Sequence, residues 1–209
     1  ICTTPGYDAA SALYGSFKAS NSVIPAAPST VDVEAALAVL SSALEEFPFA
    51  MPSDRSAALA AMLTAAARQS LPTAPMFHIK AHQPGTGKSY LSALISALAS
   101  PHVGAPQSFP SNNDECDKVL LATLKQGAAV IEFDNLTGDV VPFKKLCTVL
   151  TSERVSGRVL GSSRTVEVST RSLILSSGNN VAPVGDMIRR CITVNLDAQT
   201  EGPAARRGC

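Results

Sequence analysis

The chain has 209 residues, 45% of them hydrophobic, and its 17 Lys and Arg balance its 17 Asp and Glu. This length suits one or two domains with a buried core, and zero net charge excludes binding to nucleic acid through overall positive charge. Five scattered cysteines form no zinc-ligand spacing, and no apolar run is long enough to span a membrane, so we expect a cytoplasmic protein without a membrane partner.

The first 73 residues are expected to support the rest of the chain rather than to carry chemistry. Residues 1–30 contain several Pro and Gly with little periodicity, which predicts a loosely ordered lead-in. Residues 31–73 predict an N-terminal helical segment: one helix starts near Ser29 and stops at Pro48, and another runs from a Ser53 N-cap to a point before Pro72. Because the chain begins with Ile1, we interpret it as part of a longer polypeptide or as a processed product.

Residues 76–100 predict a short apolar strand, a glycine-bearing loop and an amphipathic helix. The GTGKS run in this loop matches the phosphate-binding end of a P-loop, in which glycines let backbone N–H groups approach phosphate and the helix N-terminus adds a positive dipole end. Lys88 is expected to reach the β- and γ-phosphates of ATP, and the Ser89 hydroxyl is expected to bind Mg²⁺. His82 departs from the full pattern, which has glycine there, and a glycine turn before an ordinary helix is the alternative. The residues predicted to hold the nucleotide are Pro84, Gly85, Thr86, Gly87, Lys88, Ser89 and Tyr90.

A second apolar strand, residues 128–133, leads to Asp134, which is the expected second Mg²⁺ contact, the Walker B position. The 45 residues from Ser89 to Asp134 leave room for a helix, a strand and another helix, as in ring-forming ATPases. Asn135 stands where many hydrolytic ATPases carry a glutamate, and an amide orients water but takes no proton. Glu132 is the spare candidate for that role, or else a buried, paired structural acid.

A basic stretch follows, because residues 144–171 carry six basic and two acidic side chains. A helix over 142–150 contains Lys144 and Lys145, and two alternating runs around residues 161–163 predict a β-hairpin whose turn is flanked by Arg158 and Arg164. These four residues are the predicted DNA-binding residues. The alternative is an ordinary hairpin with charges on its solvated face.

The strand at 172–176 ends near Asn179 and Asn180, whose amides are suited to holding the γ-phosphate or the attacking water, with a plain turn as the alternative. Arg189 and Arg190 precede the last strand, 191–196. Either arginine is suited to reaching the γ-phosphate of a neighbouring subunit, or to pairing within the subunit with Asp186 or Asp197. Residues 199–209 read as a C-terminal tail.

Together these motifs resemble an AAA+ ATPase, and in detail the helicase domain of phage, prophage and mobile-element primase–helicase proteins of the superfamily-three-like kind. The resemblance covers about residues 76–198. It rests on the GTGKS loop, on FPSNNDECDKVLLATLKQGAAVIEFDNL, and on LTSERVSGRVLGSSRTVEVSTRSLILSSGNNVAPVGDMIRRCITVNLDA.

The resemblance implies an α/β P-loop NTPase of the AAA+ type, a three-layer sandwich with a mostly parallel five-stranded sheet and an inserted β-hairpin. The core would occupy residues 74–198, with no helical lid in the tail. It also implies a homo-hexameric ring with ATP between subunits and single-stranded DNA in the channel. The leading hypothesis is therefore an ATP-hydrolysing helicase domain that serves replication of a phage or mobile element. The alternatives are an ATP-switched assembly or loading module on DNA without unwinding activity, and a small-molecule kinase.

Overall fold

The computed structural model describes residues 5–9, 13–15, 27–102, 104–158 and 164–198. Contacts between residues divide the chain into two compact units, Ile1–Ala43 and Leu44–Cys209. The domain boundaries expected at residues 30/31, 73/74 and 198/199 stay predictions; the division by contacts places the second helix in the same unit as the sheet.

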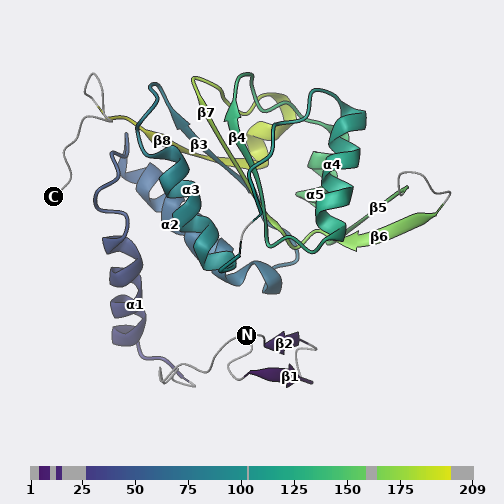
Figure 1. Ribbon diagram of the computed structural model, residues 1–209. Coiled ribbons are helices and arrows are strands. Elements are labelled where there is room, and N and C mark those ends of the chain that lie inside the picture. The colour runs from purple at the N-terminus through teal and green to yellow at the C-terminus, as the bar shows by residue number, and fades with distance from the viewer. Residues whose placement is uncertain (1–4, 10–12, 16–26, 103, 159–163, 199–209) are drawn as a thin grey trace. The chain divides into compact units, whose positions relative to one another are not determined.

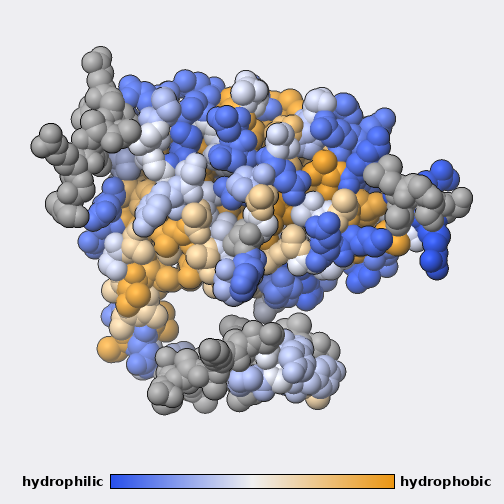
Figure 2. All heavy atoms as spheres, in the orientation of Figure 1, coloured by the Kyte–Doolittle hydropathy of each residue, from blue (hydrophilic) through white to orange (hydrophobic). Residues whose placement is uncertain are grey.

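The first unit contains a short hairpin and one helix. The hairpin pairs β1 (Gly6–Asp8) with β2 (Leu13–Gly15) in antiparallel register, within the segment expected to be a loosely ordered lead-in. Helix α1 (Thr30–Ser42) starts where the sequence predicts, because Ser29 and Asp32 form a capping box: the Ser29 N–H donates to Asp32 Oδ2 over 2.9 Å. Hydrophobic side chains are exposed on α1 (Figure 2), among them Val31 and Val39.

The second unit is an α/β fold with a four-stranded parallel sheet. Its strands are β3 (Met76–Ala81), β4 (Val130–Leu136), β7 (Leu173–Asn179) and β8 (Cys191–Leu196), in the order β4-β7-β3-β8. Strand β7 therefore separates the strand before the glycine-bearing loop from the strand that carries Asp134. Parallel strands end at the same edge of the sheet, so the segments that follow them meet there.

The expected fifth strand, around residues 107–109, is reduced to a single bridge. Gln107 lies parallel to Phe133; its N–H donates to the Glu132 carbonyl over 2.8 Å, and its carbonyl accepts from the Asp134 N–H over 3.2 Å. Pro106 and Pro110 flank this bridge, and proline is depleted in strands. Among the residues that the structure describes, the sheet therefore has four strands rather than the expected five.

Helices cover both faces of this sheet (Figure 1). Helices α2 (Pro52–Ala67) and α3 (Lys88–Ala99) pack together on one face, and α4 (Asn113–Lys125) and α5 (Lys144–Val149) lie on the other. Short 3₁₀ turns, Arg68–Ser70 and Gly185–Arg189, follow α2 and precede β8. The predicted Ser53 N-cap is wrong: the N-cap is Met51, two residues earlier, and α2 begins at Pro52; the Met51 N–H donates to the Asp54 carboxylate over 3.0 Å.

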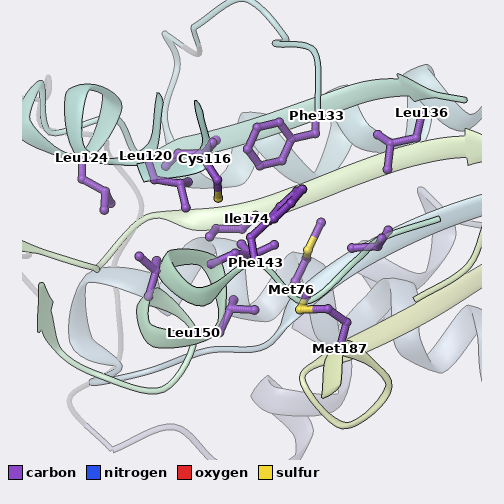
Figure 3. Close-up of a cluster of buried hydrophobic side chains, with 14 of the residues drawn as sticks. Met76, Cys116, Leu120, Leu124, Phe133, Leu136, Phe143, Leu150, Ile174 and Met187 are labelled. Carbon is purple, nitrogen blue, oxygen red and sulfur yellow. The ribbon is translucent and has the colours of Figure 1, made fainter. Parts of the chain in front are cut away.

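The main hydrophobic core lies between the sheet and the α4–α5 face. Side chains from α4, β4 and β7 point toward one another there (Figure 3), including Cys116, Leu120, Leu124, Phe133 and Ile174. Because side chains alternate along β4, burying Ile131 and Phe133 against this core turns Glu132 and Asp134 to the α3 side.

The predicted basic hairpin is confirmed. Strands β5 (Arg154–Arg158) and β6 (Thr165–Ser169) pair in antiparallel register with Arg158 opposite Thr165, and the turn expected at residues 161–163 lies outside the described residues. The hairpin is anchored to the helices beside it, because Lys145 Nζ donates to the Ser156 carbonyl over 2.9 Å and Gly157 packs closely on Leu121.

None of the helices in the described part of the chain combines the length and the hydrophobicity that crossing a bilayer requires.

Candidate functional site

The loop between β3 and α3, residues 82–87, is shaped by two glycines. Gly85 and Gly87 have φ values of 77° and 93°, in the left-handed region that favours glycine. Gly87 is the N-cap of α3, and the Leu91 N–H donates to its carbonyl over 2.9 Å. The N–H groups of Lys88, Ser89 and Tyr90 precede the first bond of the helix and have no acceptor within it, so the first turn of α3 presents donors to an anion.

Asn180 holds the start of this loop. Its backbone N–H donates to the Ala81 carbonyl over 3.0 Å, and its side-chain amide contacts both the His82 carbonyl (3.2 Å) and His82 Nδ1 (2.8 Å). Its φ of 55° places the side chain for these contacts. His82, which stands where the P-loop pattern has glycine, is therefore bound to the residue that follows β7. Asn180 thus supports the conformation of the 82–87 loop through these hydrogen bonds.

Asn179 instead contacts the lysine of the loop. Lys88 Nζ donates to Asn179 Oδ1 over 2.7 Å, which joins the first turn of α3 to the end of β7. Burial lowers the pKa of Lys88, and the negative charge of Asp134 acts in the opposite direction. The structure thus brings three predicted site residues together: Lys88, Asn179 and Asp134.

The two acids of β4 face the same cavity. Glu132 and Asp134 line a cavity of about 310 Å³ together with Ser89 and the small side chains of α3. A register shift follows Phe133, and Asn135 has a φ of 55° within it, so the strand is bent where Asp134 is placed. Ser89 and Asp134 therefore lie on the same side of the sheet, as a shared cation requires.

Serine hydroxyl groups hold both carboxylates. Ser92 of α3 donates to Glu132 Oε1, and Ser177 of β7 donates to Asp134 Oδ1, which also accepts from the Asn135 N–H over 2.8 Å. Burial raises the pKa of Glu132, the Ser92 hydrogen bond lowers it, and the charge of Asp134 raises it further. Glu132 is therefore both paired and half-buried beside the cavity, and both interpretations of this residue stay open. The Asn135 side chain is exposed.

Arg189 and Arg190 lie at the opposite end of the sheet. The Arg190 carbonyl accepts from the N–H of Met76, the first residue of β3, whereas the 82–87 loop follows the last residue. The first and last residues of β3, Met76 and Ala81, are five residue steps apart, which is roughly 16 Å along a strand. Both guanidinium groups pair with Asp186, that of Arg190 over 2.6 Å, and the Arg189 side chain is 74% exposed. The structure therefore does not bring either arginine to the loop of its own chain.

The predicted DNA-binding residues differ in their surroundings. Lys144, Arg158 and Arg164 are exposed. Lys145 is 16% exposed, lies 3.7 Å from the Asp117 carboxylate and bonds to the hairpin backbone. Lys145 thus anchors the hairpin, and its ammonium group is paired with Asp117 and the Ser156 carbonyl rather than directed to solvent.

Phe47 is a candidate residue that the sequence reasoning missed. Its ring stacks on Tyr90 with centroids 5.8 Å apart, and a Cβ on Gly87 would lie 3.6 Å from it. Its segment pairs with the end of β8, where the Ala50 N–H donates to the Asn195 carbonyl over 3.0 Å. Nothing local in the sequence links this segment to the loop some 40 residues later; the clustered aromatics Phe47 and Phe49 were the available signal.

Comparison with known proteins supports the fold. No family model matches the chain, and no curated protein matches it. Among solved structures the chain is similar to the A-form apo structure of the NrS-1 C-terminal region, with a TM-score of 0.55 and 14% sequence identity. The match covers 78% of this chain and 40% of the other, so this chain spans less than half the length of that structure.

We expect Gly178→Ala to disturb the site, because Gly178 lies between Ser177 and Asn179 in a crowded place. An added Cβ would meet Val181 Cγ2 at 2.3 Å and the Leu136 carbonyl oxygen at 3.0 Å. Overpacking of this kind costs about 1–3 kcal/mol. Thermal unfolding should show a lower Tm, whereas Gly138→Ala, at a glycine with open space around it, serves as the control. Equal Tm values for the two variants would contradict the packing described here.

Proposed function

We propose that this chain is the ATP-binding and ATP-hydrolysing domain of an AAA+ helicase that acts on DNA in the replication of a phage or mobile element. The observation that carries the proposal is the convergence of Lys88, Ser89, Asn179 and Asp134 at one edge of a parallel sheet, beside a glycine-shaped loop. The strand order and the likeness in fold to the NrS-1 C-terminal region are compatible with it.

The residues at this edge fit a nucleoside triphosphate with Mg²⁺. The loop and the first turn of α3 offer N–H donors and a lysine to phosphate oxygens. Ser89 and Asp134 offer a hydroxyl and a carboxylate, the hard oxygen ligands that Mg²⁺ takes together with phosphate. The stacked rings of Phe47 and Tyr90, next to Gly87, offer a surface for the base.

The proposed hydrolysis assigns one task to each group. Mg²⁺, when bound, neutralises charge on the β- and γ-phosphates. Lys88 donates hydrogen bonds to phosphate oxygens, and Asn179, its partner in this structure, orients the γ-phosphate end. Water attacks the γ-phosphorus as the bond to the ADP oxygen breaks, and Glu132 is the carboxylate placed beside the cavity to accept the proton of that water.

The placement of the arginines supports assembly into a ring. Arg189 and Arg190 lie about one strand length from their own loop, so a role in γ-phosphate chemistry requires the site of another copy. We propose a homo-hexamer with ATP between subunits. The hairpin of β5 and β6, with Arg158 and Arg164 beside its turn, would face single-stranded DNA in the channel.

One observation favours a second candidate, an ATP-switched assembly or loading module on DNA that does not unwind it. Asn135, at the usual position of the catalytic glutamate, offers an amide that takes no proton, and its side chain is exposed. Strand separation coupled to DNA-stimulated ATP hydrolysis supports the helicase; nucleotide-dependent oligomerisation without strand separation supports the loading module.

We expect Lys88→Ala to abolish ATP turnover, because it removes the ammonium donor next to Asn179 and Asp134. Loss of one such donor costs roughly a hundredfold or more in rate. Phosphate release from ATP is the measurement. Lys118→Ala, which removes an exposed lysine on α4, is the control and should keep the rate. Full turnover by the Lys88 variant would refute the loop assignment.

We expect Phe47→Ala to weaken ATP binding roughly tenfold, because stacking on a base is worth about 1–3 kcal/mol. Calorimetry should show this loss for ATP and no loss for inorganic triphosphate, which has no base to stack. Phe47→Tyr keeps the ring and should retain ATP affinity. A similar loss for both ligands would place Phe47 in support of the loop rather than of the base.

We expect Arg158→Ala to weaken binding of single-stranded DNA and to reduce the slope of log affinity against log salt by about 0.7, the value for one phosphate contact. Arg158 is exposed beside the hairpin turn. Arg55→Ala makes the same change in charge on α2, which lies on the other face of the sheet from α4 and α5, so it is the control. An unchanged slope for Arg158→Ala would exclude this residue from the DNA contact.

A further inference from the structure

Ser177 places a fully buried hydroxyl group in β7, beside β4. It follows Ser176, whose hydroxyl contacts His78 Nδ1 at 2.8 Å, and the exposed fraction of Ser177 is 0%. Burying a hydroxyl without a hydrogen bond costs free energy, and alanine would fill the same space without that cost. The hydroxyl of Ser177 is used: it donates to Asp134 Oδ1 on the neighbouring strand.

This contact makes the two oxygens of the Asp134 carboxylate unequal. Oδ1 accepts from both Ser177 Oγ and the Asn135 N–H (2.8 Å). Within the part of the chain that the structure describes, Oδ2 has no hydrogen bond, and Asp134 lines the cavity together with the exposed Ser89. With Oδ1 held at two points, the plane of the carboxylate is fixed and Oδ2 is the oxygen available to a ligand.

We propose that Ser177 is a positioning residue for a divalent cation, because it selects Asp134 Oδ2 as the oxygen that meets the ion. The inference rests on the proposed function, in which the cation accompanies a nucleotide. Hydrogen bonds to a ligating carboxylate orient it, and their loss costs 10–100-fold in metal affinity or activity. In Ser177→Ala the Asp134 carboxylate keeps only the Asn135 N–H contact at Oδ1 and rotates more freely. Its Oδ2 atom is then no longer held in the orientation that meets the cation.

A matched control comes from the second acid of β4, Glu132, which lies two residues before Asp134 and has its own serine partner, Ser92 of α3. Ser92 donates to Glu132 Oε1 as Ser177 donates to Asp134 Oδ1, and both acids line the same cavity. Glu132 is proposed to act on water rather than on the cation. Removing each hydroxyl in turn therefore separates an effect on the cation from a general loss of polar contacts at the cavity.

The test measures Mn²⁺ binding by electron paramagnetic resonance in the presence of ADP, alongside ADP binding in EDTA and thermal unfolding. Ser177→Ala should weaken Mn²⁺ binding about 10–100-fold, with ADP binding in EDTA retained. Ser177→Cys, whose thiol is a weaker donor, should fall between it and the unaltered chain. Ser92→Ala should retain Mn²⁺ affinity.

Each other outcome overturns the proposal. If both Ser177 variants keep the Mn²⁺ affinity of the unaltered chain, the positioning role is refuted. The proposed function still stands in that case, provided that Lys88→Ala weakens nucleotide binding. An equal loss in Ser92→Ala refutes the selection of Asp134 by Ser177. A chain that binds neither ADP nor Mn²⁺ before any substitution refutes the proposed function itself. If Ser177→Ala does not fold, Ser177→Cys carries the comparison.

Discussion

The hydrogen bond between Lys88 and Asn179 depends on one constraint, the parallel register of the sheet. Parallel pairing of β3 with β7 brings the loop and Asn179 to the same edge, and pairing of β7 with β4 brings Asp134 there as well. An antiparallel strand at either position would carry its polar residue to the far edge. The site is therefore a consequence of strand direction, and each side chain needs no more than a short reach to its partner.

Side chains alternate along β4, so one face of the strand packs in the hydrophobic core and the other lines the polar cavity. Ile131 and Phe133 enter the apolar core under α4 and α5, while Glu132 and Asp134 face α3. The polar face is kept stable because its acids receive hydroxyl hydrogen bonds and because the facing side of α3 is built from serine and alanine. Small residues also leave the cavity that larger side chains would close. The face of the sheet under α4 and α5 thus stabilises the fold, whereas the face toward α3 provides the cavity and the hydroxyl groups that hydrogen-bond to the two acids.

Features that depend on neighbouring residues could be predicted from the sequence, whereas features that depend on contacts between distant segments could not. The GTGKS loop, Asp134 at its strand and the hairpin are local patterns, and the structure places the loop, the acid and the two hairpin strands where those patterns predict. The prediction of a strand at residues 107–109 was wrong, because the single bridge there depends on Phe133, which lies 26 residues later in the chain. Phe47, and the tie between Asn180 and His82, escaped prediction because their partners come from distant segments.

The position of the arginines follows from the same register. Because β8 is parallel to β3, residues that precede β8 must lie at the edge opposite the loop, and the Met76–Arg190 backbone bond fixes this. In the proposed ring, one edge of the sheet would hold the phosphates of its own site while the other serves the site of the next copy. Asp186 holds both guanidinium groups in the chain described here. An arginine that reaches a phosphate must therefore exchange one anionic partner for another, and this exchange would link the geometry between copies to the presence of nucleotide.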